Sequence, residues 1–136
     1  MLLGKAHSVL FWVDMILIII LLWMVINQVV IFVRSRRAAK IVDNEEFKKA
    51  MHHAQVIDVR EEDSFKAGHI LGARNIPFSQ FKMYIGGIRK DMPVYLYEQG
   101  KALALRCAII LKKEGFDKIF VLKDGYNKWD GKKKKN

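Results

Sequence analysis

The chain has 136 residues, a formal net charge of +10, one cysteine and two prolines. This length favours one domain of ordinary size, a lone cysteine excludes a disulfide framework or thiolate metal cluster, and low proline and glycine content excludes a low-complexity chain. Residues 1–40 carry five basic residues against one acid, residues 41–130 carry 15 against 13, and residues 131–136 add four lysines. Because a nucleic-acid-binding domain concentrates positive charge on its folded body, no nucleic-acid partner is expected.

An apolar run begins near the start of the chain. Residues 9–33 contain three strongly polar residues, Asp14, Asn27 and Gln28. At a rise of about 1.5 Å per residue, a helix over this run exceeds the roughly 30 Å hydrocarbon core of a bilayer. A cleaved signal peptide would have an apolar stretch of about 7–15 residues followed by small residues. The sequence therefore predicts a retained transmembrane helix over residues 9–33, with the lipid bilayer as its partner.

Basic residues flank this helix unequally. Lys5 and His7 precede it, whereas four basic residues lie in the segment 34–40, which we predict to be a basic juxtamembrane linker. Basic flanks remain on the cytoplasmic side, so we expect a single-pass protein of the cell membrane with its N-terminus outside and its C-terminal domain in the cytoplasm.

Polar residues of the helix have two interpretations. Asp14, Leu21 and Gln28 recur every seven residues and lie near one helix face. Hydrogen bonds along such a seam could hold two copies together as a weak homodimer. Alternatively, the polar residues mark the two interfacial ends of the span, and the lack of a small-xxx-small pattern favours this alternative.

Residues 41–130 alternate short apolar runs with helical patterns. Buried strands are predicted at 56–59, 94–97 and 118–122, and helices at 43–51, 61–68, 79–84, 102–114 and 126–129. This alternation predicts an α/β fold, a small doubly wound parallel sheet with helices on both faces. Ligands of such sheets bind at the carboxyl ends of the strands, so the loop after Tyr97 is the candidate site.

Several motifs of this domain stand in a characteristic order. They are Val56-Ile-Asp-Val-Arg60, Phe65-Lys-Ala-Gly-His-Ile70, Gly72-Ala-Arg-Asn-Ile-Pro77, Lys112-Lys-Glu-Gly-Phe116 and Val121-Leu-Lys-Asp-Gly-Tyr-Asn-Lys-Trp129. Together they resemble the rhodanese homology domain over residues 39–131. The resemblance implies a doubly wound α/β domain whose active members transfer sulfane sulfur, from a donor such as thiosulfate, through a cysteine persulfide.

The resemblance also locates the residues of sulfur transfer. The family pattern Cys-x-x-Gly-x-Arg-Ser, aligned without gaps, places its cysteine at Glu98, its glycine at Lys101, its arginine at Leu103 and its serine at Ala104. No catalytic residue is therefore expected. The degenerate loop that could still bind a ligand comprises Glu98, Gln99, Gly100, Lys101, Ala102 and Leu103.

The one cysteine lies outside this loop. Cys107 falls on the apolar face of the following helix, where a buried thiol has a raised pKa and behaves as a small hydrophobe. Glu98 has two interpretations. Its carboxylate could accept hydrogen bonds from the loop amides, with Lys101 neutralising it, or it could be an exposed side chain without a partner.

The remaining polar and aromatic residues receive structural interpretations. Adjacent His52 and His53 diverge on a helix and no ligand set follows, so no metal or other cofactor is expected. By resemblance, Asp58, Arg60 and His69 hold the ends of strands and loops. Tyr95, Tyr97 and Trp129 are predicted core aromatics.

These observations favour a membrane-anchored, non-catalytic rhodanese-like domain that binds or scaffolds an unknown cytoplasmic protein. The alternative is a sulfurtransferase with an atypical loop. Phosphate-ester hydrolysis on a related loop would need the same missing cysteine and an arginine. We expect residues 131–136 to be a basic tail, either solvated and disordered or attracted to anionic lipid.

Overall fold

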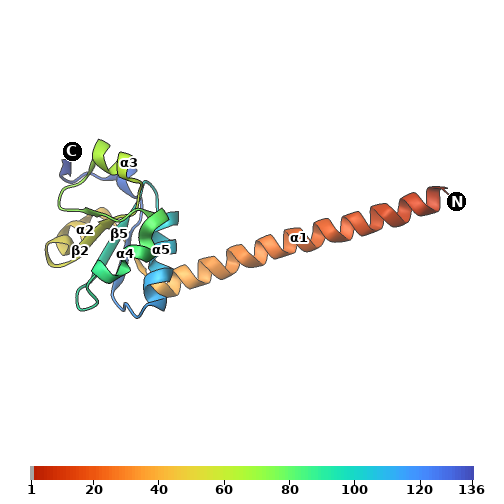
Figure 1. Cartoon of the computed structure of the whole chain (residues 1–136), viewed down its shortest axis with the longest axis horizontal. Coiled ribbons are helices and arrows are strands. Elements are labelled where there is room, and N and C mark those ends of the chain that lie inside the picture. Colours follow the sequence, from red (N-terminus) through yellow and green to blue (C-terminus); the bar gives the residue numbers. More distant parts are fainter. Residues whose placement is uncertain (1) are drawn as a thin grey trace. The chain divides into compact units, whose positions relative to one another are not determined.

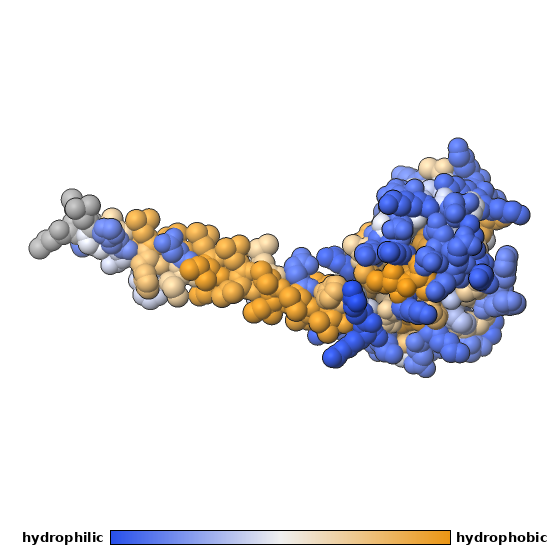
Figure 2. Space-filling model, turned by 180° about the vertical axis from the view of Figure 1, so that it is seen from behind, coloured by the Kyte–Doolittle hydropathy of each residue, from blue (hydrophilic) through white to orange (hydrophobic). Residues whose placement is uncertain are grey.

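The structure is a computed structural model that describes residues 2–136, and it divides into two compact units, one ending at Arg34 and one spanning Ser35–Asn136. The first unit belongs to helix α1, Leu2–Ala38. Within the described residues, the stretch Gly4–Ala38 is long and apolar enough to cross a membrane, and an 18-residue window within it has a mean hydropathy of 2.9. Apolar side chains cover its surface (Figure 2). This confirms the predicted long apolar helix.

The segment 34–40, the predicted basic juxtamembrane linker, is largely helical. Helix α1 continues through it to Ala38, and strand β1, Lys40–Val42, begins two residues later. Ser35, Ala38 and Ala39 are buried in the second unit. Arginine and alanine are good helix formers, so the helix continues to Ala38, and the two alanines are small enough to pack closely.

A five-stranded parallel sheet forms the centre of the second unit (Figure 1). Its strands, in spatial order, are β1, β6 (Ile119–Leu122), β5 (Val94–Tyr97), β2 (Gln55–Asp58) and β4 (Arg74–Asn75). Each neighbouring pair is parallel. The predicted parallel α/β fold is confirmed, and the three predicted strands are β2, β5 and β6.

Helices connect the strands close to their predicted positions. They are α2 (Asn44–Ala50), η1 (Met51–His53), α3 (Glu62–Ala67), η2 (Phe78–Gln80), α4 (Phe81–Tyr84), η3 (Ile85–Gly87), α5 (Ala102–Lys113) and η4 (Tyr126–Lys128). The Asp43 carboxylate caps α2 by accepting from the Glu46 N–H at 2.9 Å. Gly115, with φ of +93°, ends α5 in the left-handed conformation that glycine adopts without strain.

Side chains alternate between two cores on opposite faces of the sheet. In β5, Val94 and Leu96 join a cluster that includes the buried face of α5, whereas Tyr95 and Tyr97 join a cluster around Phe47 of α2. Such alternation is the period of two that a β-strand imposes. Tyr95, Tyr97 and Trp129 are buried, so the predicted core aromatics are confirmed.

The basic tail pairs with the domain, which differs from the first of its two expected states, a solvated and disordered segment. Strand β7, Lys133–Lys134, pairs antiparallel with β3, His69–Ile70. The Leu71 N–H donates to the Lys132 carbonyl, and the Asn136 N–H donates to the Lys66 carbonyl, each at 3.0 Å. Two lysines have little intrinsic strand preference, so this pairing depends on an edge that only the folded domain presents.

Candidate functional site at the loop after β5

The loop after β5 lies at the carboxyl ends of the parallel strands. It runs from Glu98 to Lys101 and leads into α5. The register pairs Tyr97 of β5 with Asp58 of β2, so Asp58 and Arg60 reach the same end of the sheet. The structure therefore brings the predicted loop and the predicted Asp58–Arg60 pair together.

Backbone hydrogen bonds hold this loop against the segment 125–127. The Tyr126 N–H donates to the Glu98 carbonyl at 2.8 Å, and the Asn127 N–H donates to the Gln99 carbonyl at 3.3 Å. Gly125 has φ of +67°, and a Cβ there would collide with the Gln99 and Gly100 carbonyls. Only glycine allows so close an approach, which fixes where the loop runs.

Side-chain hydrogen bonds of Gln99 also hold the loop in place. Gln99 accepts from Arg60 Nη1 at 3.1 Å through Oε1, and its Nε2 donates to Asn127 Oδ1. The Arg60 guanidinium also lies 4.3 Å from the centre of the Tyr126 ring, a cation–π distance. Gln99 therefore ties the loop to two elements far away in the sequence.

Asp58 and Arg60 form a buried ion pair. Arg60 Nη2 donates to Asp58 Oδ2 at 2.7 Å, and the Arg60 backbone N–H donates to Asp58 Oδ1 at 2.9 Å. Arg60 Nη2 also donates to the Gly68 carbonyl at 2.7 Å. Burial works against the charge on Arg60, but hydrogen bonds to Asp58 raise its pKa overall. The expected structural role of this pair is confirmed.

Glu98, which the sequence analysis places at the family's cysteine position, is buried, with 8% of its surface exposed. Within residues 2–136, no hydrogen bond or ion pair joins its carboxylate to the loop amides or to Lys101. Neither of the two arrangements left open by the sequence, an amide cradle or an exposed carboxylate, therefore describes this buried side chain. The hydrogen bonds to Tyr126 and Asn127 orient the loop instead. The carboxylate lies beside Gly100, where a Cβ would be 3.6 Å from Oε1.

Cys107 is fully buried in the core that α5 covers, as predicted. Burial, and secondly the charge of the Glu98 carboxylate, raise the pKa of its thiol. Sulfur transfer requires a thiolate, and both influences disfavour one. The side chains of Leu103 and Ala104 also belong to this core, where the family pattern would have an arginine and a serine. These two positions therefore carry neither an arginine nor a serine, and the thiol of Cys107 is buried.

The raised pKa of Cys107 predicts that the domain loses stability in alkali. The unfolded thiol ionises near pH 8.5, so above this pH the unfolded chain binds fewer protons than the folded one. The free energy of unfolding should then fall by up to about 1.4 kcal/mol per pH unit. Urea unfolding followed by circular dichroism at several pH values would measure this slope. The Cys107→Ala variant should flatten it, and an unchanged slope would contradict the prediction.

His69 has a structural role, as predicted. It is buried, its ring stacks on Phe65 with centroids 3.7 Å apart, and Nδ1 lies 2.8 Å from the Phe65 carbonyl oxygen. Sequence reasoning missed the roles of Gln99, Tyr126 and Asn127. Tyr126 and Asn127 lie inside the motif that ends at Trp129, so the motif marked the segment but not its contact with the loop.

The parallel sheet, the motif segments around it and the loop after β5 define the architecture of a rhodanese-like domain. The family model described as "Rhodanese-like domain" matches residues 43–132, so the chain belongs to this family. It is 46% identical over 119 residues to the uncharacterized protein YqhL of Bacillus subtilis, covering 88% of this chain and 94% of YqhL.

Two further similarities are more distant. The thiosulfate sulfurtransferase GlpE of Shewanella oneidensis is 31% identical over 75 residues, which cover 55% of this chain and 74% of GlpE. The crystal structure of a rhodanese-related protein from Thermoplasma volcanium aligns with a TM-score of 0.66 at 17% identity, covering 70% of this chain and 97% of that one. The structural likeness supports the fold.

Proposed function

We propose that this protein is a membrane-anchored rhodanese-like domain that does not transfer sulfur and acts as a binding or scaffolding module for a cytoplasmic protein. The observation that carries the proposal is the pair formed by Glu98 and Cys107. A carboxylate stands at the cysteine position, and the one thiol of the chain is buried where that carboxylate further disfavours its ionisation.

The loop supports a binding role because it is held in one conformation. Gln99 joins it to Arg60 and Asn127, and its carbonyls accept from the segment 125–127. A loop that is already ordered loses little conformational entropy when a partner binds. We propose that the partner is a protein that contacts this end of the sheet.

Helix α1 supports anchorage in a bilayer, and its flanking charges support the proposed orientation. Arg34, Arg36 and Arg37 follow the apolar stretch, whereas Lys5 precedes it. Under the positive-inside rule this asymmetry favours a cytoplasmic domain and an external N-terminus. Self-association along Asp14, Leu21 and Gln28 is compatible with this arrangement but is not required by it.

A sulfur-transfer assay tests the absence of catalysis. With thiosulfate as donor and cyanide as acceptor, the wild-type chain should give no turnover above background and match Cys107→Ala. Mass spectrometry should detect no persulfide on wild-type Cys107, whereas Glu98→Cys, which returns a thiol to the loop, should gain one sulfur atom. An active thiosulfate sulfurtransferase provides the positive control.

The alternative function, a sulfurtransferase with an atypical loop, draws support from the similarity to GlpE. The same assay separates the two. Wild-type turnover that is lost in Cys107→Ala would establish the alternative and refute a non-catalytic role.

A further inference from the structure

Glu98 differs from other buried polar side chains of the domain. Asp58 and Arg60 neutralise each other, and His69 Nδ1 lies 2.8 Å from the Phe65 carbonyl oxygen. The Glu98 carboxylate, by contrast, forms no hydrogen bond and no ion pair with any of the described residues 2–136. Burial of a charge is costly unless another group pairs with it, so this carboxylate needs a partner that the fold does not provide.

The basic residues of the loop region do not pair with Glu98. Arg60 is already engaged, since it donates to Asp58 and to Gln99. Lys101, the lysine of the loop itself, is exposed and forms no ion pair with another described residue. The part of the chain that the structure describes therefore supplies no counter-charge for Glu98.

The carboxylate of Glu98 can nevertheless be reached from solvent. Among the described residues that are not exposed, every side-chain nitrogen or oxygen shielded from solvent has a hydrogen-bond partner. Glu98 has none, so its oxygens keep some contact with solvent although the residue is only 8% exposed. Gly100 leaves open space beside them, because a Cβ there would meet only Glu98 Oε1 within 4 Å, at 3.6 Å, apart from its chain neighbours.

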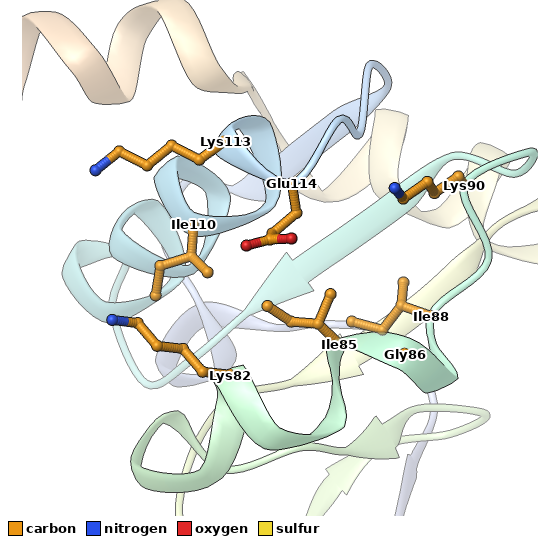
Figure 3. Close-up of a pocket in the computed structure, with 8 residues that line it drawn as sticks. All are labelled: Lys82, Ile85, Gly86, Ile88, Lys90, Ile110, Lys113 and Glu114. Carbon is orange, nitrogen blue, oxygen red and sulfur yellow. The ribbon is translucent and has the colours of Figure 1, made fainter.

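A second acid without an ion pair lies in a different setting. Glu114 lines an open pocket of about 710 Å³ between α4–η3 and the end of α5, and it is exposed (Figure 3). The ammonium groups of Lys82 and Lys113 extend away from that pocket. Water stabilises an exposed carboxylate, so Glu114 needs no counter-ion, whereas the enclosed Glu98 does.

A basic side chain suits the Glu98 carboxylate better than a metal ion does. Ca²⁺ and Mg²⁺ require several oxygen ligands, and within residues 2–136 no three His, Cys, Asp or Glu side chains are grouped to hold a metal. An arginine guanidinium needs only one carboxylate, to which it donates two parallel hydrogen bonds. It is also more weakly hydrated than an ammonium group, so it enters a nearly enclosed site at a lower cost.

We propose that the loop after β5 binds an arginine side chain of the partner protein, and that the Glu98 carboxylate accepts from its guanidinium. The guanidinium enters beside Gly100 and supplies the charge that the domain lacks there. A sulfur-transferring loop holds an anionic sulfur, so the charge of the bound group is reversed in this chain. The inference rests on the proposed function, in which this end of the sheet contacts a protein.

The test uses the full chain in neutral detergent micelles, with its backbone amides observed by NMR. The probe is Nα-acetyl-argininamide, and the matched control is Nα-acetyl-citrullinamide, which has nearly the same shape without the positive charge. Both are added at constant ionic strength. The arginine probe should shift the amide resonances of residues 98–101, and the citrulline probe should leave them unchanged.

Three variants locate the binding. Glu98→Gln should weaken the response to the arginine probe by at least about tenfold, the effect of losing a hydrogen bond to a charged group. Gly100→Ala keeps the carboxylate but places a methyl group against Oε1, so it should weaken the response too, and it decides the question if Glu98→Gln fails to fold. Glu114→Gln removes the same charge from an exposed position and should respond like wild type.

Three results would overturn the inference: no shift of the wild-type loop amides with the arginine probe, equal shifts with the citrulline probe, or an equal loss in Glu114→Gln. Each of them leaves a non-catalytic role intact, because the sulfur-transfer assay is read independently. Wild-type turnover that is lost in Cys107→Ala would instead refute the proposed function, whatever the arginine probe does.

Discussion

Asp58→Ala is expected to lower the free energy of unfolding of the domain by about 3–5 kcal/mol. Asp58 is fully buried, and its carboxylate accepts from the Arg60 side chain at 2.7 and 3.1 Å. Removing it leaves the Arg60 guanidinium, 8% exposed, without its counter-charge. Such a charge has neither water nor a carboxylate to stabilise it, so the cost exceeds the value of the ion pair itself.

The loss extends to the candidate site. Arg60 also donates to Gln99 and to the Gly68 carbonyl, so Asp58 positions the group that fixes the loop. Arg60→Ala should be similarly costly because it leaves Asp58 unpaired. The double variant should cost less than the sum of the two single variants, since the residues act as one unit.

Chemical modification of the single cysteine would measure the loss of stability in the Asp58→Ala variant. Cys107 is fully buried, so a thiol reagent should modify it only when the domain opens, and modification across a urea series in neutral detergent reports unfolding of this domain alone. Glu62→Ala, which removes the exposed ion pair with Lys66, is the matched control and should match wild type. An Asp58→Ala midpoint equal to that of Glu62→Ala would refute the argument.

Two arginines in the middle of α1, Ile19→Arg with Leu22→Arg, are expected to release the chain from the membrane. Each arginine at the centre of a span costs about 2.5–3.5 kcal/mol on insertion scales. Ile19 is 58% exposed and Leu22 is 56% exposed, so within the described residues no protein surface shelters the introduced charges. Together they offset much of the apolar transfer energy of the helix.

Flotation in a density gradient after carbonate extraction would measure this effect. The wild-type chain should float with the membranes, and the double arginine variant should remain in the load fraction. Ile19→Ala with Leu22→Ala keeps the same positions apolar and should still float. A double arginine variant that floats like wild type would show that α1 does not reside in the hydrocarbon core.

Much of the fold was predictable because its determinants are local or repeat along the chain. The apolar helix follows from the continuous hydrophobic run of residues 9–33. Asp43 caps a helix and Gly115 ends one through contacts within a few residues along the chain. The buried strands β2, β5 and β6 are short apolar runs, so the hydrophobic pattern of the sequence predicts them. The positions of Cys107 and Trp129 followed from the periodicity and motifs around them.

Three of the strands outside the sequence prediction are too short to carry a pattern. Strand β1 has three residues, while β3 and β7 have two each, and β7 consists of two lysines. Their formation depends on partners more than 60 residues away along the chain, such as Phe120 for Lys40 and Ile70 for Lys133. The extension of α1 to Ala38 likewise depends on a core surface that receives it.

Four features can be recognised from the sequence alone, because each is a matter of residue type at a position along the chain. They are the family, the apolar helix, the uneven basic flanks and a carboxylate at the position where the family's cysteine is expected. The contacts that hold the loop, by contrast, become visible only in the folded domain. Gln99, Arg60 and Asn127 meet because parallel strands bring their carboxyl ends together. Hydrogen bonds from the Tyr126 and Asn127 N–H groups to the loop carbonyls, and not an amide cradle around Glu98, orient the loop.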